Sequence, residues 1–180
     1  SLSAENALQI VTESLSGTLH DWIEKMRGEI DDEIFRQLLV RGFRKVAYEL
    51  AHMHEKNEAH FDVKPKNIFL KYDTPAAVRS GCLGDFGSSA AASGCRRMYA
   101  AAAKALPEED KEDPGIPSDT FLFGMCVWCA ASGGSFADAP SAERIAAESS
   151  YWSGYRLRAL KEVVLPCVDE SPGERPSMSR

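Results

Sequence analysis

The sequence has few basic residues for its size: 21 Lys and Arg stand against 27 Asp and Glu, so the formal net charge is −6. A nucleic-acid binder needs an excess of positive charge to neutralise phosphates, so this balance argues against that class of protein. No apolar run approaches the ~20 residues of a membrane-spanning helix. The first residues also lack the basic start and apolar stretch that mark a signal peptide.

Cysteine is scarce as well, with five residues in a chain of 180. The number is odd, the spacing shows no disulfide framework, and a chain of this length can bury a core without cross-links. This usage predicts a reducing, intracellular location, in the cytoplasm or the nucleus. A hydrophobic fraction of 44% and a charged fraction of 27% are typical of a globular protein, here of one domain.

The periodicity of apolar residues predicts a mainly helical fold with little β-structure. Thr18 has the properties of a helix N-cap, and Asp31 or Asp32 those of the next one. The apolar segment 121–131 predicts a buried central helix, and Gly133-Gly134 after it predicts a break. The expected helices cover residues 19–26, 32–54, 121–131, 141–148 and 156–167. The expected strands cover residues 8–13, 67–70 and 82–85, the last two as a pair, and residues 87–117 are expected to form a long irregular loop.

Oxygen-bearing side chains gather around the predicted strand pair. Asp62 and Asn67 lie five residues apart in one loop, and Asp85 follows the second strand, 18 residues after Asn67. Hard cations such as Mg²⁺ prefer such ligands, and the same groups can orient an attacking hydroxyl. Lys64, two residues after Asp62, can neutralise a phosphate that is being transferred. The pattern indicates phosphoryl transfer.

These residues resemble, in order and spacing, the catalytic loop and the metal-binding Asp-Phe-Gly motif of eukaryotic-type protein kinases. Lys64-Pro65 after Asp62 is the serine/threonine pattern, and residues 60–70 most resemble the Wee-type cell-cycle kinases. Residues 10–13 resemble the hinge, with Thr12 at the gatekeeper position. The resemblance extends over about residues 8–178.

Three later segments carry the same resemblance. Residues 105–108 are similar to the Ala-Pro-Glu motif, with one extra residue inside it. Residues 118–124 are similar to the start of the central helix, whose Asp119 is implied to anchor the catalytic loop. Arg175 lies in a late Arg-Pro motif, and the resemblance implies that it pairs with Glu108.

The resemblance implies a protein-kinase-like C-terminal lobe: a mainly α lobe in which a small β-strand pair carries the catalytic and metal loops. It implies ATP and Mg²⁺ as cofactors, a protein substrate or binding partner, and transfer of the γ-phosphate to a Ser or Thr hydroxyl. The implied segments within residues 1–180 are the hinge at about 8–17, the catalytic loop at 60–67 and the activation segment at 85–108. The implied catalytic residues are Asp62, Lys64 and Asn67, the metal ligands Asn67 and Asp85, and the adenine-side residues Thr12, Glu13, Leu15 and Phe69.

Two departures from the family pattern leave the activity open. Phe61 stands where the family has an Arg that would receive an activating phosphate. Seven residues precede the hinge, so a glycine-rich loop, a β3 Lys and an αC Glu are not assigned, and an N-lobe or a partner is expected to cover the exposed surface of the lobe. The chain is then either part of a longer kinase, inactive in isolation, or a pseudokinase-type scaffold for protein interaction.

Other conspicuous residues have simpler interpretations. Cys126 and Cys129 have the Cys-x-x-Cys spacing of redox and zinc sites, but inside an apolar helix they are expected to be buried core residues. His60 is expected to pack under Phe86 and bind backbone, and His52 and His54 to face solvent or complement a helix dipole. The acidic run 108–113 is most simply a solvated loop, with selection of basic peptides as its alternative.

Overall fold

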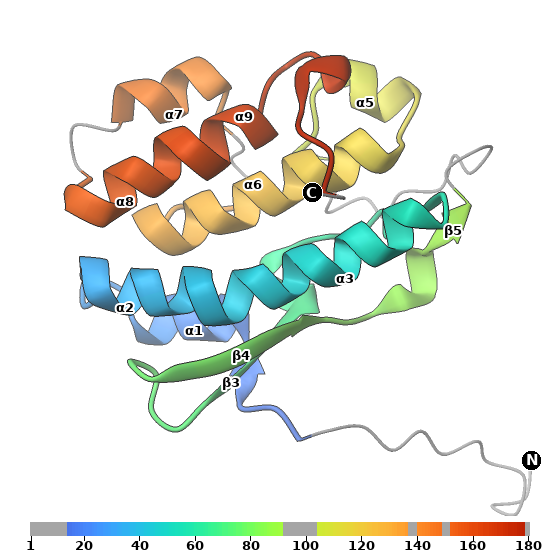
Figure 1. Cartoon of the computed structure of the whole chain (residues 1–180). Coiled ribbons are helices and arrows are strands. Elements are labelled where there is room, and N and C mark those ends of the chain that lie inside the picture. The colour runs from blue at the N-terminus through green and yellow to red at the C-terminus, as the bar shows by residue number, and fades with distance from the viewer. Residues whose placement is uncertain (1–13, 92–103, 137–139, 149–151, 179–180) are drawn as a thin grey trace, which may run out of the picture.

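Helices packed around one central helix make up most of the protein, with a small antiparallel sheet on one side (Figure 1). The structure is a computed structural model, and it describes residues 14–91, 104–136, 140–148 and 152–178. The α-helices are α1 (Leu19–Lys25), α2 (Asp32–Gln37), α3 (Arg44–Glu55), α5 (Glu108–Glu112), α6 (Ile116–Ser132), α7 (Ala142–Glu148), α8 (Gly154–Ala159) and α9 (Leu165–Cys167). The π and 3-10 segments are η2 (Leu38–Phe43), η3 (Pro65–Asn67), η4 (Phe86–Ser88), η6 (Leu160–Val164) and η7 (Pro172–Glu174).

Helix α6 is the centre of the core, as its sequence predicts. It contacts α1, α3, η6 and α9, and Figure 1 shows it lying between α3 on one side and the α8–α9 helix on the other. Its side chains are buried all round from Ser118 to Ala131. It ends at Gly133, whose φ of 70° is a left-handed conformation that glycine adopts without steric cost.

Helices α2, η2 and α3 form one continuous helix that covers the expected range and runs to Glu55. Apolar residues at steps of three and four along this range predict one buried stripe, formed by Leu39, Phe43, Val46, Leu50 and Met53. Phe43, Val46 and Leu50 are buried, whereas Leu39 and Met53 are only half-buried. A π turn takes an extra residue per turn and so shifts the phase of the helix, and Leu38 is buried for that reason.

The start of α1 is the local structure that its sequence predicts. The Thr18 side chain accepts a hydrogen bond from the Asp21 backbone N–H, and the Asp21 carboxylate accepts from the Thr18 N–H, which together make a capping box. Asp31 is the N-cap of α2, and its side chain accepts the backbone N–H of Ile34 at 2.8 Å.

The sheet contains the predicted strand pair and one further strand. The strand order is β1 (Gly17–Thr18), β3 (Ile68–Tyr72), β4 (Val78–Leu83), and neighbouring strands are antiparallel. In this register Phe69 on β3 lies opposite Thr18 on β1 and opposite Cys82 on β4. Strand β4 packs directly on η2. The two backbones are so close that a Cβ at Gly81 would lie 2.8 Å from the Gly42 carbonyl oxygen. A second, two-stranded sheet pairs β2 (Glu58–Ala59) with β5 (Ala90–Ala91).

Two expectations are corrected by the described residues. The range 87–117 is not one irregular loop, since it contains β5, the helix α5 and the start of α6. The acidic run is not simply a solvated loop, because it forms α5 and buries Asp110, which is 1% exposed. The strand expected over residues 8–13 lies outside the described residues. No helix within the described ranges has the length and apolar character needed to cross a membrane.

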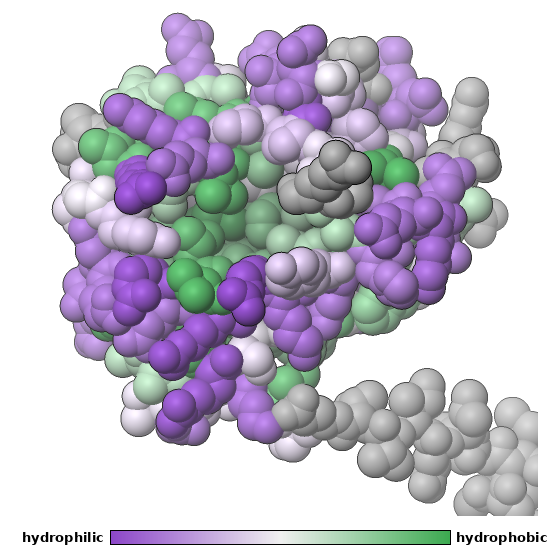
Figure 2. Space-filling model, in the orientation of Figure 1, coloured by the Kyte–Doolittle hydropathy of each residue, from purple (hydrophilic) through white to green (hydrophobic). Residues whose placement is uncertain are grey.

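The face turned to the viewer carries a hollow of apolar residues. Figure 2 shows hydrophobic side chains gathered between α6 and the α2–α3 helix, with hydrophilic residues around them. The α2–α3 helix also exposes Val40 and Tyr48, at 41% and 67% of their surfaces. Apolar surface of this kind is a feature of interaction sites.

Candidate functional site

The loop over residues 60–67 is attached to the core by one buried carboxylate. Asp119, on α6, accepts the backbone N–H of His60 at 2.7 Å and the backbone N–H of Phe61 at 2.9 Å. Asp119 is 0% exposed, and Phe61 is buried with a φ of 62°. The carboxylate therefore holds the loop in a left-handed turn that a non-glycine residue rarely adopts. This confirms Asp119 as the predicted anchor of the loop.

His54 joins the same carboxylate, which the sequence did not predict. Its Nε2 lies 3.1 Å from Asp119 Oδ2, and the residue is only 8% exposed. The expectation that His54 faces solvent is therefore wrong. The end of α3, the start of α6 and the loop are tied together at Asp119, because each carboxylate oxygen can accept more than one hydrogen bond.

His60 is a structural residue, as predicted. Its Nε2 lies 3.1 Å from the Gly84 carbonyl oxygen, and its Nδ1 accepts the Asp62 backbone N–H at 3.3 Å. A neutral imidazole protonated on Nε2 satisfies both contacts. Its ring meets the Phe86 ring edge to face at 5.2 Å between centroids. Burial lowers the pKa of His60 from its usual 6.5, against the opposing effect of Asp119, so the imidazole is kept neutral.

The three residues predicted to be catalytic lie in direct contact. The Lys64 ammonium donates to both carboxylate oxygens of Asp62, at 2.9 Å to Oδ1 and 2.7 Å to Oδ2. Asn67 Nδ2 donates to Asp62 Oδ2 and to the Asp62 carbonyl oxygen, both at 2.9 Å. Oδ1 therefore accepts one of these bonds where Oδ2 accepts two, which leaves Oδ1 the freer oxygen for a further donor.

The loop that carries Asp85 is held against the catalytic loop through Gly84. The Gly84 backbone N–H donates to the Asn67 carbonyl oxygen at 2.9 Å, while its own carbonyl faces His60. Asp85 follows in a left-handed conformation (φ 59°, ψ 63°) and is exposed. The turn at Gly84 and Asp85 is thus adjacent to the catalytic loop at Asn67.

Asn67 and Asp85 fit a magnesium ion that also takes phosphate and water ligands. The Asp85 carboxylate has no hydrogen-bond or ion-pair partner among the described residues, and Asn67 uses its Nδ2, which leaves its Oδ1 oxygen for a cation. In the described ranges, no three His, Cys, Asp or Glu residues form a cage that could hold a metal by itself. Mg²⁺ is commonly held by one or two protein oxygens together with substrate phosphates, so both observations suit it.

The predicted adenine-side residues are placed only in part. Phe69 is half-buried on β3, and its ring packs on Gly84, where a Cβ would lie 2.7 Å from a ring carbon. Leu15 is half-buried just before β1, the strand paired with β3. The end of the implied hinge therefore runs beside the strand of Phe69. Thr12 and Glu13 lie outside the described residues.

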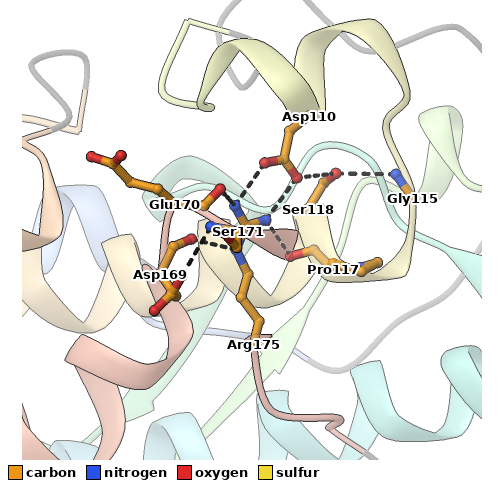
Figure 3. Close-up of polar contacts among 8 residues, drawn as sticks. All are labelled: Asp110, Gly115, Pro117, Ser118, Asp169, Glu170, Ser171 and Arg175. Carbon is orange, nitrogen blue, oxygen red and sulfur yellow. Dashed lines mark hydrogen bonds and ion pairs between the residues drawn. The ribbon is translucent and has the colours of Figure 1, made fainter. Parts of the chain in front are cut away.

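Arg175 forms a second polar cluster, far from the catalytic loop in sequence (Figure 3). Its guanidinium binds Asp110 through two hydrogen bonds of 2.7 Å, and Asp110 also accepts from the Ser118 hydroxyl at 2.7 Å. The remaining guanidinium bonds go to three backbone carbonyl oxygens, those of Pro117, Asp169 and Glu170.

The predicted partner of Arg175, Glu108, is thereby corrected to Asp110. All five N–H donors of the guanidinium are used by Asp110 and the three carbonyl oxygens, so no donor is left for another carboxylate. The guanidinium also lies 4.9 Å from the centre of the Phe121 ring. In sequence, Asp110 is one of several acids in a row, and nothing local marks it as the buried one.

The Cys-x-x-Cys pair is part of the core, as predicted. Cys126 and Cys129 are buried in α6, and Cys167 is buried on α9. Burial raises the pKa of Cys126 well above its usual value, and raises those of Cys129 and Cys167 to about 12. Thiols in this state are protonated at neutral pH and are poor nucleophiles and poor metal ligands.

Comparison with known proteins gives a family for this arrangement. The family model described as "Protein tyrosine and serine/threonine kinase" matches residues 1–180. Two relatives described as "eIF-2-alpha kinase GCN2", from Mus musculus and Rattus norvegicus, are each 42% identical to this chain over 64 residues. That segment is 34% of this chain and 4% of each relative.

Proposed function

This chain belongs to the protein tyrosine and serine/threonine kinase family, and we propose that it transfers the γ-phosphate of Mg²⁺–ATP to a Ser or Thr hydroxyl of a protein. The observation that supports the proposal is the contact between the two loops, in which the Gly84 N–H donates to the Asn67 carbonyl oxygen and so brings the residue before Asp85 against Asn67.

Asp62 is the proposed acceptor of the substrate hydroxyl. It is 2% exposed and held from two sides, by Lys64 and by Asn67, so its orientation is fixed before a substrate arrives. We propose that Oδ1 accepts the hydroxyl hydrogen, because it carries one hydrogen bond fewer than Oδ2. Lys64 has a third N–H available after its two bonds to Asp62, and this donor is proposed to face the phosphoryl oxygens.

Asn67 and Asp85 are the proposed ligands of Mg²⁺, which when bound neutralises phosphate charge and orients the phosphates. The protein prepares this site by holding the Asn67 amide on Asp62 and by leaving the Asp85 carboxylate exposed. Phe69 is the proposed apolar floor of the adenine pocket, with Leu15, Thr12 and Glu13 along the hinge at about 8–17. The proposed catalytic loop is 60–67 and the proposed activation segment 85–108.

We propose further that these residues act as the C-lobe of a kinase. The phosphate-holding parts of an N-lobe, namely the glycine-rich loop, the β3 Lys and the αC Glu, would be supplied by other sequence or by another chain, and the lobe alone would be inactive. A reducing compartment such as the cytoplasm or the nucleus is the proposed location, since the described α6 and α9 thiols are buried and free.

Magnesium-dependent nucleotide binding tests the proposal. Calorimetric titration of ATP into the protein with its N-lobe, with Mg²⁺ and with EDTA, is expected to show binding only with Mg²⁺. Asp85→Asn is expected to weaken that binding and to abolish phosphoryl transfer by the protein with its N-lobe, while the free energy of unfolding changes by less than about 0.5 kcal/mol, since Asp85 is exposed. Asp113→Asn, at another exposed aspartate, is the matched control. Near-normal turnover by Asp85→Asn would show that the metal assignment is wrong.

The alternative function is a pseudokinase-type scaffold that binds a protein and no nucleotide. The observations that favour it are Phe61 in place of the usual Arg and the apolar hollow between α6 and the α2–α3 helix (Figure 2). The same titration, run on the protein with its N-lobe, decides between the two, because a scaffold would give no Mg²⁺-dependent heat at millimolar ATP even with that lobe present.

The substrate is a separate proposal. Residues 60–70 favour a Wee-type cell-cycle kinase, whereas the identity shared with the GCN2 relatives favours eIF-2-alpha, the protein in their name. A phosphorylation assay with eIF-2-alpha beside cell-cycle substrates distinguishes them, because the two subfamilies predict different labelled proteins.

A further inference from the structure

A cleft of about 620 Å³ lies beside the catalytic loop, and its charge differs from that of the protein as a whole. It is lined by residues 64–66 of the loop, by one side of α1, by Lys104 and by the turn that follows α6. Four Lys or Arg residues line it against one Glu, although the chain carries a net charge of −6. The excess of base is therefore local to this cleft.

Among the described residues, two of the four basic side chains have an acidic partner and two do not. Arg27 pairs with Glu24, the one acidic residue of the lining, at 2.7 Å, and Lys64 pairs with Asp62. Lys66 and Lys104 are both exposed and have no ion-pair partner in the part of the chain that the structure describes. Unpaired cations beside a catalytic group attract an anionic ligand and raise the rate of its encounter.

The lining of the cleft is suited to a polypeptide. Ile23 on α1 and Phe136 after α6 contribute apolar side chains beside the lysines, so the cleft can contact both the apolar and the charged groups of a chain. Lys64 belongs to both the cleft and the Asp62 pair, so a chain lying in the cleft would bring a neighbouring hydroxyl to Asp62. Lys66 follows two residues later, on the 3-10 turn η3, and can reach the residues that flank this hydroxyl.

We propose that this cleft binds the substrate segment, and that Lys66 and Lys104 select Asp or Glu residues close to the accepting Ser or Thr. The inference rests on the proposed phosphoryl transfer only for the identity of the acceptor. It is opposed to the selection of basic peptides by the acidic run 108–113, because that run forms α5 and one of its carboxylates, Asp110, is already bound to Arg175.

The test is direct binding of two labelled peptides that differ only in having Glu or Lys on both sides of a central Ser. Fluorescence anisotropy without nucleotide measures the two affinities, in 20 mM and 500 mM salt. The Glu peptide is expected to bind about five- to tenfold more tightly at low salt, and the difference should shrink at high salt, since exposed ion pairs are weak and screened. Lys66→Glu, and separately Lys104→Glu, are expected to reduce or reverse the preference.

Lys161→Glu is the control variant, because it changes the net charge equally but lies on η6, outside this cleft. The proposal is overturned if neither peptide binds, if the Lys peptide binds as well as the Glu peptide, or if Lys161→Glu shifts the preference as much as Lys66→Glu does. All three substituted lysines are exposed, so thermal unfolding should match the unmodified protein in every variant. Since the binding assay contains no nucleotide, the proposed function can fail in its own titration while this proposal stands, and the reverse.

Discussion

Helix α6 supports two polar clusters, and they use their charges in different ways. Around Arg175, all five guanidinium donors are bound to Asp110 and to three backbone carbonyls, and the pair is almost completely buried. At the catalytic loop, the buried Asp119 is bound by two backbone N–H groups and by His54, but Asp85 and Lys66 keep charged atoms exposed to solvent.

The difference separates residues that hold the fold from residues available for a ligand. A buried charge without partners is costly, so the charged groups of a buried cluster must be paired in the folded protein. An exposed charge is solvated by water, so it needs no partner within the protein and is available to bind a phosphate, a cation or a peptide. Substitutions in the two buried clusters should therefore reduce stability, and those at Asp85 and Lys66 should reduce binding alone.

The largest expected effect is at Arg175. Arg175→Ala leaves the Asp110 carboxylate buried without a counter-charge, and we expect a loss of about 3–5 kcal/mol in the free energy of unfolding. Urea denaturation followed by circular dichroism measures this loss. Arg79→Ala is the matched control, because Arg79 also binds an aspartate, Asp73, but both side chains are about 60% exposed, so less than about 1 kcal/mol should be lost. Equal losses in the two variants would contradict the comparison.

A smaller effect is expected at Asp119. Asp119→Asn replaces one accepting oxygen with an NH₂ group that faces a backbone N–H, and we expect a loss of about 1–3 kcal/mol. The loop should also loosen, so the amide hydrogens of His60 and Phe61 should exchange with solvent faster than in the unmodified protein. If their exchange rates stay the same in Asp119→Asn, Asp119 is not the anchor of the loop.

The smallest expected effect is the pH dependence that His60 contributes. Burial lowers the pKa of His60, so below pH 6.5 the unfolded chain takes up a proton that the folded chain does not. Above pH 6.5 the ring is neutral in both states, so His60 contributes no pH dependence. As the pH falls from 6.5 toward the pKa of His60 in the folded protein, the free energy of unfolding decreases. Denaturation curves from pH 8 to 5, with an NMR titration of the His60 ring, measure it.

The carboxylates Asp21 and Asp32 do not obscure this window. Hydrogen bonds, chiefly from Thr18 and Ser153 respectively, lower their pKa values below 3.8, so their contribution is lost only in more acidic solution. A His60 ring that titrates at or above 6.5 in the folded protein would contradict the proposed neutral imidazole.

Local features of the fold were predictable because their causes are local. The capping box of Thr18 and Asp21, the buried helix α6 and its end at Gly133 depend on residues within a few positions of one another. The strand pair β3–β4 also follows from a short connection. The extra strand β1 and the π turn η2 escaped prediction, since each depends on packing against β3 and β4.

The candidate site likewise has features that the sequence predicted and features that only folding decided. By itself, the sequence determined the chemical groups and their spacing, with Asp62, Lys64, Asn67 and Asp85 in order along the chain, because a catalytic pattern is carried by residue types at set intervals. Only the tertiary structure decided that Asp110 rather than Glu108 meets Arg175, that His54 is buried on Asp119, and that Lys66 and Lys104 line one cleft. The physical reason is that several like residues in a row are equivalent in sequence, and folding makes them different when it buries one and leaves its neighbours in water.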